Sequence, residues 1–244
     1  LEILHVDHNE SRADWSQYPS VRDTLADWEL LPQDAERSDV ARLGVNISKS
    51  ASKGKPPAEG ILDHVERRGS GLVVMATHQR EGFDRWLHRN LSETISNRAE
   101  AASLFVPYGV DGFVNPQSGE VSLRKVLIPV DREPDPQSIL DAVADLVEGV
   151  ATEDVEVRLL HVGDPSGMPS PTLPNSEKCR WVWETKVGSV VEAILEDAEM
   201  NDVDLIAMTT NGHDGFLDAL RGSITERVLH RSRCPVMSIH SETE

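Results

Sequence analysis

The chain has 244 residues, of which 27% are charged and 39% are hydrophobic. This composition excludes a disordered or collagen-like protein, and the length suits one large domain or two domains of about 120 residues each. The 42 acidic residues outnumber the 24 basic ones and give a formal net charge of −18. Such a charge repels nucleic acids and anionic membranes, so neither is expected as a partner.

No run of about 18 apolar residues predicts a membrane span, and the N-terminal residues lack the pattern of a secretory signal. We therefore expect a cytoplasmic protein. Cys179 and Cys234 are the only cysteines. One lies in a polar context and the other begins an apolar run, so the sequence predicts two reduced thiols and no cysteine-based metal site.

The first half of the chain begins with a predicted strand, residues 1–6, which includes Leu1 itself. Residues 11–31 are polar and helix-leaning, and residues 48–57, rich in Ser, Lys, Gly and Pro, are predicted to form a loop. Residues 109–122 contain Gly, Asn, Pro, Gln and Ser and are predicted to be a linker.

The second half alternates strands with amphipathic helices, which predicts a parallel sheet covered on both faces. The predicted strands are Lys125–Asp131, Val155–Val162, Trp181–Val187, Leu205–Thr210 and Pro235–Ile239. The predicted helices are Ile139–Val150, Val190–Met200 and a last one from about Gly222 to Arg231, with Ile224, Val228 and Leu229 facing inward.

The two halves are related by an internal repeat. Residues 57–107, moved forward by 133 positions, match the second half at many places without a gap. Residues 4–6 and 160–162 are both Leu-His-Val and match at an offset of 156. Because the two offsets differ by 23, the first copy carries 23 additional residues between the two matching blocks.

The first copy has no counterpart of the strand and helix predicted within residues 125–150. In a doubly wound sheet the first strand lies in the middle, so a domain without it would leave two unpaired inner edges. By analogy with residues 124–156, we expect roughly 33 residues to precede Leu1 in the native protein.

A glycine-rich loop follows the predicted strand Leu205–Thr210. It runs from Thr209 through Gly212 to Gly222 and Ser223, where the last helix is predicted to begin. A helix N-terminus exposes N–H groups and a partial positive charge, and glycine lets the backbone approach an anion closely. The loop is therefore a candidate phosphate site, while turning and capping explain the same glycines equally well.

Several segments of the second half form a specific combination. They are Pro129-Val130-Asp131, Leu-Leu-His-Val at 159–162, Val187-Gly188, Asp204-Leu-Ile-Ala-Met208, and Gly222-Ser-Ile-Thr-Glu-Arg-Val-Leu followed by Arg-Cys234-Pro-Val. With them, residues 124–239 resemble the universal stress protein family. That family's nucleotide motif is Gly, two residues, Gly, nine residues, Gly, then Ser or Thr, and here Thr209 replaces the first glycine.

The resemblance implies an α/β fold of two tandem Rossmann-like domains of the adenine nucleotide alpha hydrolase-like kind. Each domain is expected to hold a five-stranded parallel sheet with helices on both faces. The implied boundaries are 1–108 for the first domain, which lacks its first strand and helix, 109–122 for the linker and 123–244 for the second domain.

The resemblance also implies a cleft for ATP or another adenine nucleotide, with or without Mg²⁺, in the second domain. Asp131 is expected to face the ribose and adenine, and Val162 to offer its backbone to the adenine. Gly212, Gly222, Ser223 and Thr225 are expected to hold the phosphates. The full set of expected binding residues is Pro129, Val130, Asp131, Val162, Thr209, Gly212, His213, Gly222, Ser223, Ile224 and Thr225.

The first copy carries a broken form of this motif. Its equivalents of Thr209, Gly212, Gly222 and Ser223 are Ala76, Gln79, Arg89 and Asn90. Because a long cation replaces the glycine at the helix start, we predict that the first copy binds no nucleotide. Family members pair through their last strands, so Ser103–Val106 is expected to lie beside Pro235–Ile239 as an internal pseudo-dimer, which leaves room for a homodimer.

The predicted function is therefore that of a nucleotide-dependent regulator in stress response, with hydrolysis slow at most. No nucleophile elbow or P-loop is present, and His5, His8 and His161 lack further ligands for a metal. One alternative is a protein-interaction module of the same fold that binds no nucleotide. Another is an enzyme of a related adenine-nucleotide family, whose own motifs are missing. The nucleotide, the stress and the downstream partner stay open.

Overall fold

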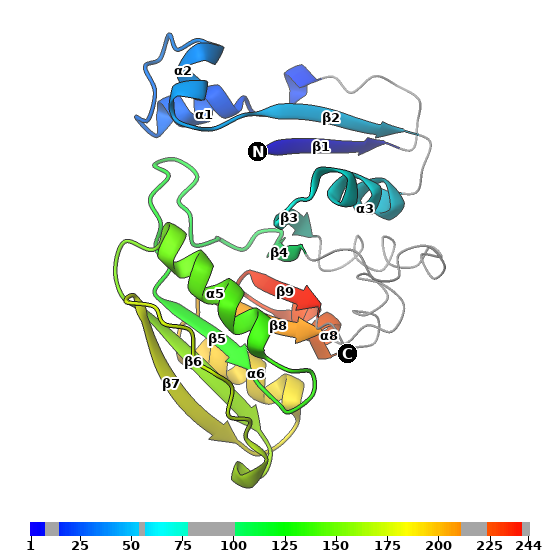
Figure 1. Ribbon diagram of the computed structural model, residues 1–244, viewed down its shortest axis with the longest axis vertical. Helices are drawn as coiled ribbons and strands as arrows, with labels where there is room; N and C mark the ends of the chain where they lie inside the picture. Colours follow the sequence, from blue (N-terminus) through cyan, green and yellow to red (C-terminus); the bar gives the residue numbers. More distant parts are fainter. Residues whose placement is uncertain (8–14, 54–56, 78–100, 211–223, 241–244) are drawn as a thin grey trace. The chain divides into compact units, whose positions relative to one another are not determined.

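The computed structural model describes residues 1–7, 15–53, 57–77, 101–210 and 224–240 (Figure 1). These residues form two compact units, one of residues 1–64 with 115–120 and the other of residues 65–114 with 121–244. In the described part of the chain, no helix has both the length and the apolar character needed to cross a membrane.

A seven-stranded sheet organises the second unit, in the order β3-β4-β9-β8-β5-β6-β7. Its strands are β3 (Leu72–Thr77), β4 (Ala102–Pro107), β5 (Lys125–Pro129), β6 (Val155–Val162), β7 (Cys179–Lys186), β8 (Leu205–Thr210) and β9 (Val236–His240). Every neighbouring pair is parallel except β4 and β9, which run antiparallel. The expected five-stranded parallel sheet is thus confirmed for the second copy, as β9-β8-β5-β6-β7.

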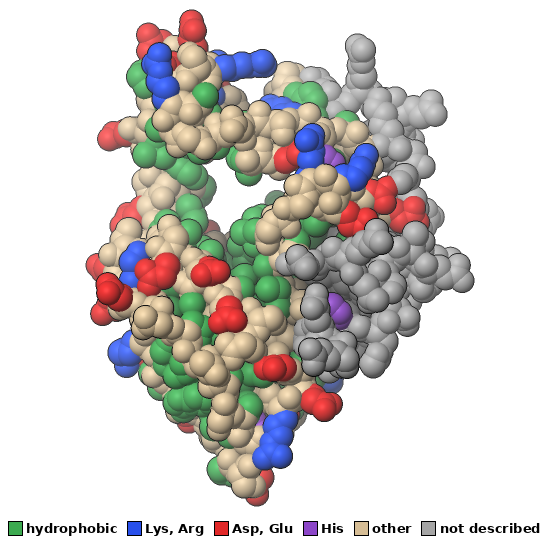
Figure 2. All heavy atoms as spheres, in the orientation of Figure 1, with side chains coloured by type: hydrophobic (Ala, Val, Ile, Leu, Met, Phe, Trp, Pro, Cys, Tyr) green, Lys and Arg blue, Asp and Glu red, His purple; other side chains and the backbone are tan. Residues whose placement is uncertain are grey.

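Helices cover both faces of this sheet. They are α5 (Gln137–Val150), α6 (Val190–Met200) and α8 (Ile224–Arg231), with a short 3₁₀ turn η2 (Pro165–Gly167) after β6. Helix α5 lies on one face, and α6 and α8 pack together on the other (Figure 1). Asp141, Asp145 and Glu148 stay exposed along α5, and acidic side chains spread over that face in Figure 2.

The central position of β5 in its half of the sheet explains why residues 126–128 form a continuous apolar run. Val126, Leu127 and Ile128 are all fully buried, because the strand has a neighbour on each side and helices above and below. They pack with Ile139, Val143 and Val147 of α5 in the main hydrophobic core. The predicted helix within residues 139–150 is therefore confirmed by the face that it buries.

The antiparallel pairing of β4 with β9 is symmetric with respect to the repeat. The pairs are Ser103 with Ser238, Leu104 with Met237, and Phe105 with Val236. Moving 103–105 forward by 133 positions gives 236–238, so the repeat exchanges the two outer pairs and keeps the central one. The predicted pairing of the two last strands is confirmed.

The four described strands of the first copy form two separate parallel pairs. Strand β1 (Glu2–Asp7) pairs with β2 (Ser48–Lys53) in its own two-stranded sheet, while β3 pairs with β4. In the second copy, β5 stands between the corresponding strands β6 and β8. Among the described residues, no strand takes the place of β5 in the first copy, and its strands do not form the single sheet expected of a complete domain.

The side chains of β3 are more exposed than those of β8, the corresponding strand of the second copy. Leu72 is 44% exposed and Val74 is 60% exposed, whereas their counterparts Leu205 and Ala207 in β8 are fully buried. Strand β8 is covered by β5 and α5, and within the described residues β3 pairs with β4 alone.

The predicted loop at residues 48–57 is wrong over most of its length. Residues 48–53 form β2, and helix α3 (Pro57–Arg68) begins at the end of the segment. The composition of residues 48–53 is poor in strand-favouring side chains. Their backbone nevertheless pairs with β1 along six residues, so tertiary pairing overrides local propensity.

The additional residues of the first copy contain short helices. They are η1 (Trp15–Gln17), α1 (Val21–Asp27) and α2 (Arg37–Arg42), and α1 falls within the segment predicted to lean toward helix. Ser20 caps α1, and a capping box between Glu36 and Asp39 starts α2. A small core of Ala26, Leu31, Ala35 and Val40 holds the helices together.

The predicted linker contains an ordered turn. Val114 and Val121 form an antiparallel bridge. Between them, the Asn115 side chain accepts hydrogen bonds from the backbone N–H groups of the two residues at 117 and 118. The indole of Trp28 donates to the carbonyl of Pro116 at 2.9 Å. Gly119 has φ of +73°, and a Cβ there would lie 2.6 Å from the Trp28 ring, so only glycine fits.

A buried ion cluster attaches α6 to the sheet. Asp197 is 1% exposed, and its carboxylate lies 2.6 Å from the Lys186 ammonium and 3.4 Å from the Arg158 guanidinium. Arg158 also donates to Glu156 at 3.0 Å, and this hydrogen bond is the main reason that the pKa of Glu156 is lowered. The cluster satisfies a buried carboxylate that would otherwise be costly.

Asp197→Ala is expected to lower the free energy of unfolding by about 3 kcal/mol, because it leaves two cations without their buried counter-ion. Glu196→Ala, at an exposed position of the same helix, should change it by less than about 0.5 kcal/mol. Urea denaturation followed by circular dichroism measures both variants. Equal losses for the two would show that the cluster does not stabilise the fold.

Leu104→Ala is expected to cost about 2 to 4 kcal/mol, because Leu104 is 9% exposed at the centre of the β4·β9 pairing. The control Leu72→Ala, on the neighbouring strand but 44% exposed, should cost less than about 1 kcal/mol. The same denaturation experiment compares them. A larger loss for Leu72→Ala would contradict the pairing of the last strands in solution.

Candidate functional site

A cavity of about 240 Å³ opens at the carboxyl ends of β5, β6 and β8, beside the first turns of α6 and α8. This is the edge where ligands bind in doubly wound α/β folds. Seven of the residues expected to bind nucleotide line it, namely Pro129, Val130, Asp131, Val162, Thr209, Ile224 and Thr225. The other four, Gly212, His213, Gly222 and Ser223, lie outside the described residues.

The sheet positions the first three of these residues. The N–H of Val130 donates to the carbonyl of Leu160 at 2.9 Å, so the pairing of β5 with β6 continues up to the cavity. Asp131 comes next and is exposed, and its carboxylate accepts the N–H of Arg132 at 2.8 Å. The Asp131 carboxylate is therefore held at the rim, facing solvent and any ligand.

Several lining residues were not expected from the sequence. They are Glu133, Pro134, Leu160, Val190, Ile194, Met208 and Thr210. Val190 and Ile194 were assigned to the inward face of their helix, and helical spacing alone could have found that face. Periodicity does not say whether an inward residue meets the core or a cavity, since that depends on where the neighbouring loops lie.

The two sides of the cavity differ in their electrostatic character. Asp131 and Glu133 contribute carboxylates, and no Lys or Arg is among the described lining residues. This side suits hydroxyl and amino donors and repels phosphate. Ile224 and Thr225 bring the first described turn of α8 to the other side, where helix N–H groups favour an anion.

Thr209 occupies the position of the first motif glycine. Its hydroxyl oxygen is buried and has no hydrogen-bond partner among the residues that the structure describes. Because an unpaired buried hydroxyl is unfavourable, a partner for Thr209 would stabilise the site. Thr209 therefore adds both bulk and an unused hydrogen-bonding group to the cavity wall.

In the first copy, aromatic side chains pack against the histidine near the end of β1. His5 corresponds to His161, and its Nδ1 lies 2.8 Å from the Tyr18 hydroxyl. The rings of His5, Trp15 and Tyr18 pack with centroids 5.3 to 6.2 Å apart, and the Lys49 ammonium lies 5.4 Å from the Trp15 ring. Both aromatic residues lie between the two matching blocks of the repeat, where the first copy is longer by 23 residues.

Neither strand-end histidine is arranged as a metal ligand. His161 faces two backbone carbonyl oxygens, and His5 faces Tyr18. Across the described residues, no three His, Cys, Asp or Glu side chains gather at a spacing that could hold a metal ion.

A larger cavity, of about 560 Å³, lies beside the last turns of α6 and α8. Its two arginines are paired: Arg231 makes two hydrogen bonds of 2.6 Å to Glu192, and Arg233 makes one of 2.6 Å to Glu199, while the exposed Asp202 also lines the cavity. Burial raises the pKa of the Cys234 thiol, so this group stays protonated. None of the residues expected to bind nucleotide is among those that line this larger cavity, so the smaller one is the better candidate site.

The family model for the universal stress protein family matches residues 1–107 and 172–240, which together are more than half of the chain. The chain belongs to the universal stress protein family. The two matched segments agree with two tandem domains. A universal stress protein of Methanocaldococcus jannaschii is 28% identical over 148 residues, covering 50% of this chain and 85% of that protein.

Solved structures show the same fold across the whole chain. A universal stress protein of Archaeoglobus fulgidus is 17% identical with a TM-score of 0.58, covering 99% of this chain and 87% of its own. A candidate universal stress protein of Pseudomonas aeruginosa is 16% identical with a TM-score of 0.58, covering 98% and 82%. At these identities the likeness establishes the fold and no function.

Both thiols of this universal stress protein are expected to react slowly with iodoacetamide in the folded state at pH 7. Burial raises the pKa of Cys179 and of Cys234, so thiolate is scarce at neutral pH and labelling should accelerate as the pH rises. Mass spectrometry after timed labelling of folded and urea-unfolded protein measures both sites. Labelling of folded Cys234 at the unfolded rate would contradict its burial.

Proposed function

We propose that the second domain, residues 123–244, binds ATP or a related adenine nucleotide and that the protein acts as a nucleotide-dependent regulator in stress response. One observation carries the proposal. Seven expected binding residues, drawn from segments far apart in the sequence, converge on one cavity at the carboxyl edge of the sheet. Family membership supports the same reading.

Different parts of the cavity suit the base, the ribose and the phosphates of such a ligand. Val130, Val162, Ile194 and Met208 provide apolar surface for the base. The Asp131 carboxylate suits the ribose hydroxyl groups as a hydrogen-bond acceptor. The phosphates belong at the α8 side, where the motif residues Gly212, Gly222, Ser223 and Thr225 are expected, with Mg²⁺ offsetting their charge.

The first domain, residues 1–108, is proposed to bind no nucleotide and to serve as a structural or regulatory partner, joined through the linker at 109–122. Arg89 stands where the helix-start glycine is needed. In addition, Trp15 and Tyr18 pack against His5 at the end of β1, an arrangement that differs from the backbone contacts of His161 in the second copy. Both features disfavour a second site.

A second candidate is a protein-interaction module of the same fold that binds no nucleotide. Thr209 in place of glycine is the observation that favours it, because a side chain there takes up space at the cavity wall. Mass spectrometry of small molecules released from the freshly purified protein distinguishes the two candidates. Stoichiometric adenine nucleotide supports the proposal, and an empty protein that also fails to bind in solution supports the module.

Calorimetric titration with ATP and MgCl₂ tests the proposed site. The wild-type chain is expected to bind about one ATP, and Asp131→Ala should weaken binding by about tenfold or more, since a carboxylate–hydroxyl hydrogen bond is worth about 1.5 to 3 kcal/mol. Asp145→Ala, at an exposed position on α5, is the matched control and should bind as the wild type does.

A Gly222→Arg variant completes the test by copying Arg89 of the first copy into the second. It should abolish binding, because a long side chain would enter the phosphate site. Two ATP molecules per chain, or unchanged binding by Gly222→Arg, would contradict the assignment of the site to the second domain.

A further inference from the structure

Two of the residues that line the candidate cavity carry carboxylates, Asp131 and Glu133. The Asp131 carboxylate already accepts the N–H of Arg132 at 2.8 Å. Glu133 is exposed, and no residue that the structure describes donates a hydrogen bond to its carboxylate or forms an ion pair with it. Glu133 therefore brings to the cavity a hydrogen-bond acceptor that no described part of the protein uses.

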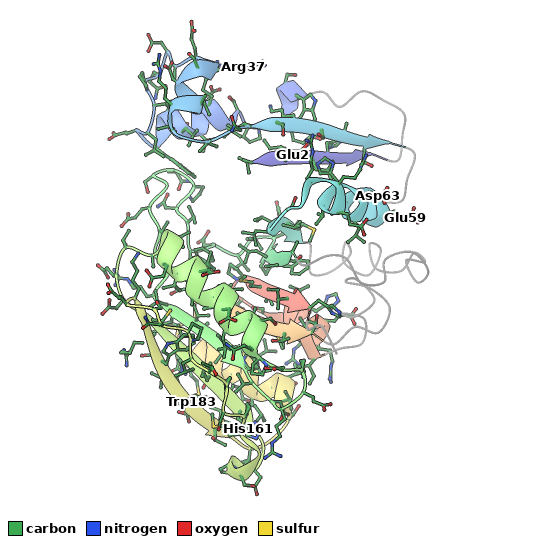
Figure 3. All side chains as sticks on the ribbon, viewed as in Figure 1. Glu2, Arg37, Glu59, Asp63, His161 and Trp183 are labelled. Atoms are coloured by element: carbon green, nitrogen blue, oxygen red, sulfur yellow. The ribbon has the colours of Figure 1, made fainter. Side chains whose placement is uncertain are left out.

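The chain just before Glu133 is tied to the loop after β6. The Arg132 guanidinium donates to the carbonyl of Ser166, in η2, at 3.0 Å. The ring of His161, which Figure 3 shows at the end of β6 near η2, lies 3.2 Å from the carbonyl oxygen of Val130. Both contacts hold the start of the loop after β5 beside the end of β6, where the cavity opens.

The chain just after Glu133 is constrained as well. Pro134 also lines the cavity, and its ring fixes its own backbone angle φ. The Asp135 carboxylate accepts the N–H of Gln137, the first residue of α5, at 2.9 Å. The backbone of Glu133 is therefore positioned from both directions, and a ligand has to order little more than the side chain.

The chemistry of a carboxylate limits what Glu133 can recognise. An ionised carboxylate only accepts hydrogen bonds, and its charge repels phosphate oxygens and ring nitrogens that carry lone pairs. Its partner in a ligand must therefore be an N–H or O–H group. An adenine nucleotide has two kinds of such donors, the hydroxyl groups of the ribose and the amino group of the base.

The strand order indicates which of these donors lies nearer to Glu133. In the order β9-β8-β5-β6, the strands on the proposed phosphate side, β8 and β9, lie on one side of β5, and β6 lies on the other. The loop that carries Glu133 is tied toward the loop after β6. Glu133 is therefore at the end of the cavity away from α8, which is the end left for the base. Asp131, closer to the end of β5, suits the ribose.

We propose that Glu133 is a specificity-determining residue of the candidate site, which accepts a hydrogen bond from the amino group of the bound base; this rests on the function proposed above. A base that carries the amino group supplies the missing donor. A base without it leaves the carboxylate unpaired, so it binds more weakly. Glu133 thus distinguishes the base, while Asp131 contacts the sugar.

Calorimetric titration in the presence of MgCl₂ tests the proposal by comparing ATP with purine riboside triphosphate, in which a hydrogen atom replaces the amino group of adenine. The wild type is expected to bind ATP about threefold to tenfold more tightly than the analogue. Glu133→Ala should bind the two equally well. The ratio of the two affinities is the readout, because removing a negative charge changes the affinity for both triphosphates alike.

Two further variants serve as controls. Asp131→Ala should weaken the binding of both triphosphates and keep the wild-type ratio between them. Glu177→Ala removes another exposed carboxylate, outside the cavity lining, and should behave as the wild type does. Circular dichroism checks that each variant is folded.

A second analogue, 2′-deoxy-ATP, shows whether the effect of Glu133 is confined to the base. Glu133→Ala should keep the preference of the wild type for ATP over 2′-deoxy-ATP, since the ribose is assigned to Asp131. If the substitution reduced the preference over both analogues equally, the contact with the amino group would be overturned.

The outcomes separate this proposal from the proposed function. If ATP binds but Glu133→Ala retains the preference for ATP over purine riboside triphosphate, or the wild type has no such preference, the contact of Glu133 is overturned and the nucleotide site stands. If neither triphosphate binds to the wild type, the proposed function fails and the role of Glu133 fails with it. A preference that is lost in Glu133→Ala alone supports both.

Discussion

The backbone pairing of β5 with both β6 and β8 is the constraint on which the second domain depends. It joins two halves of the sheet that have no other contact in the strand order. The Asp204 carboxylate fixes the start of β5 by accepting the N–H groups of Arg124 and Lys125 at 2.8 and 2.9 Å. At its other end, β5 delivers Val130 and Asp131 to the cavity. In the first copy, the described strands form two separate pairs with no strand between them that corresponds to β5.

The pairing of β4 with β9 joins strands of the two copies in one seven-stranded sheet. Its register is symmetric about Leu104 and Met237, as expected when a surface that could join two identical domains joins two repeats of one chain. This pairing places β3 and β4 of the first copy in the same sheet as the five strands of the second. The two copies differ around the corresponding histidines: Trp15 and Tyr18 pack against His5 in the first, whereas two backbone carbonyl groups contact His161 in the second.

Much of the candidate site was predictable because sequence motifs and strand ends coincide in this fold. Pro129, Val130, Asp131 and Val162 end parallel strands, so the topology brings them to one edge once the strands are recognised. Glu133 and Met208 could not be predicted in the same way, since their place at the cavity depends on the path of a loop and on the packing of neighbouring side chains. The two contacts of His161 are likewise invisible in sequence, because they are made to backbone atoms, which every residue carries.

By itself, the sequence determined the duplication, the alternation of strands and helices in the second copy and the family. These follow from hydrophobic periodicity and repeated motifs, which are local or directly comparable along the chain. Tertiary structure alone decided that residues 48–53 form a strand, that the first copy's strands separate into two pairs, and that the linker folds into a turn beside Trp28. In each case, the deciding interaction joins backbone or ring atoms of residues far apart in the sequence, and no local pattern records such a partner.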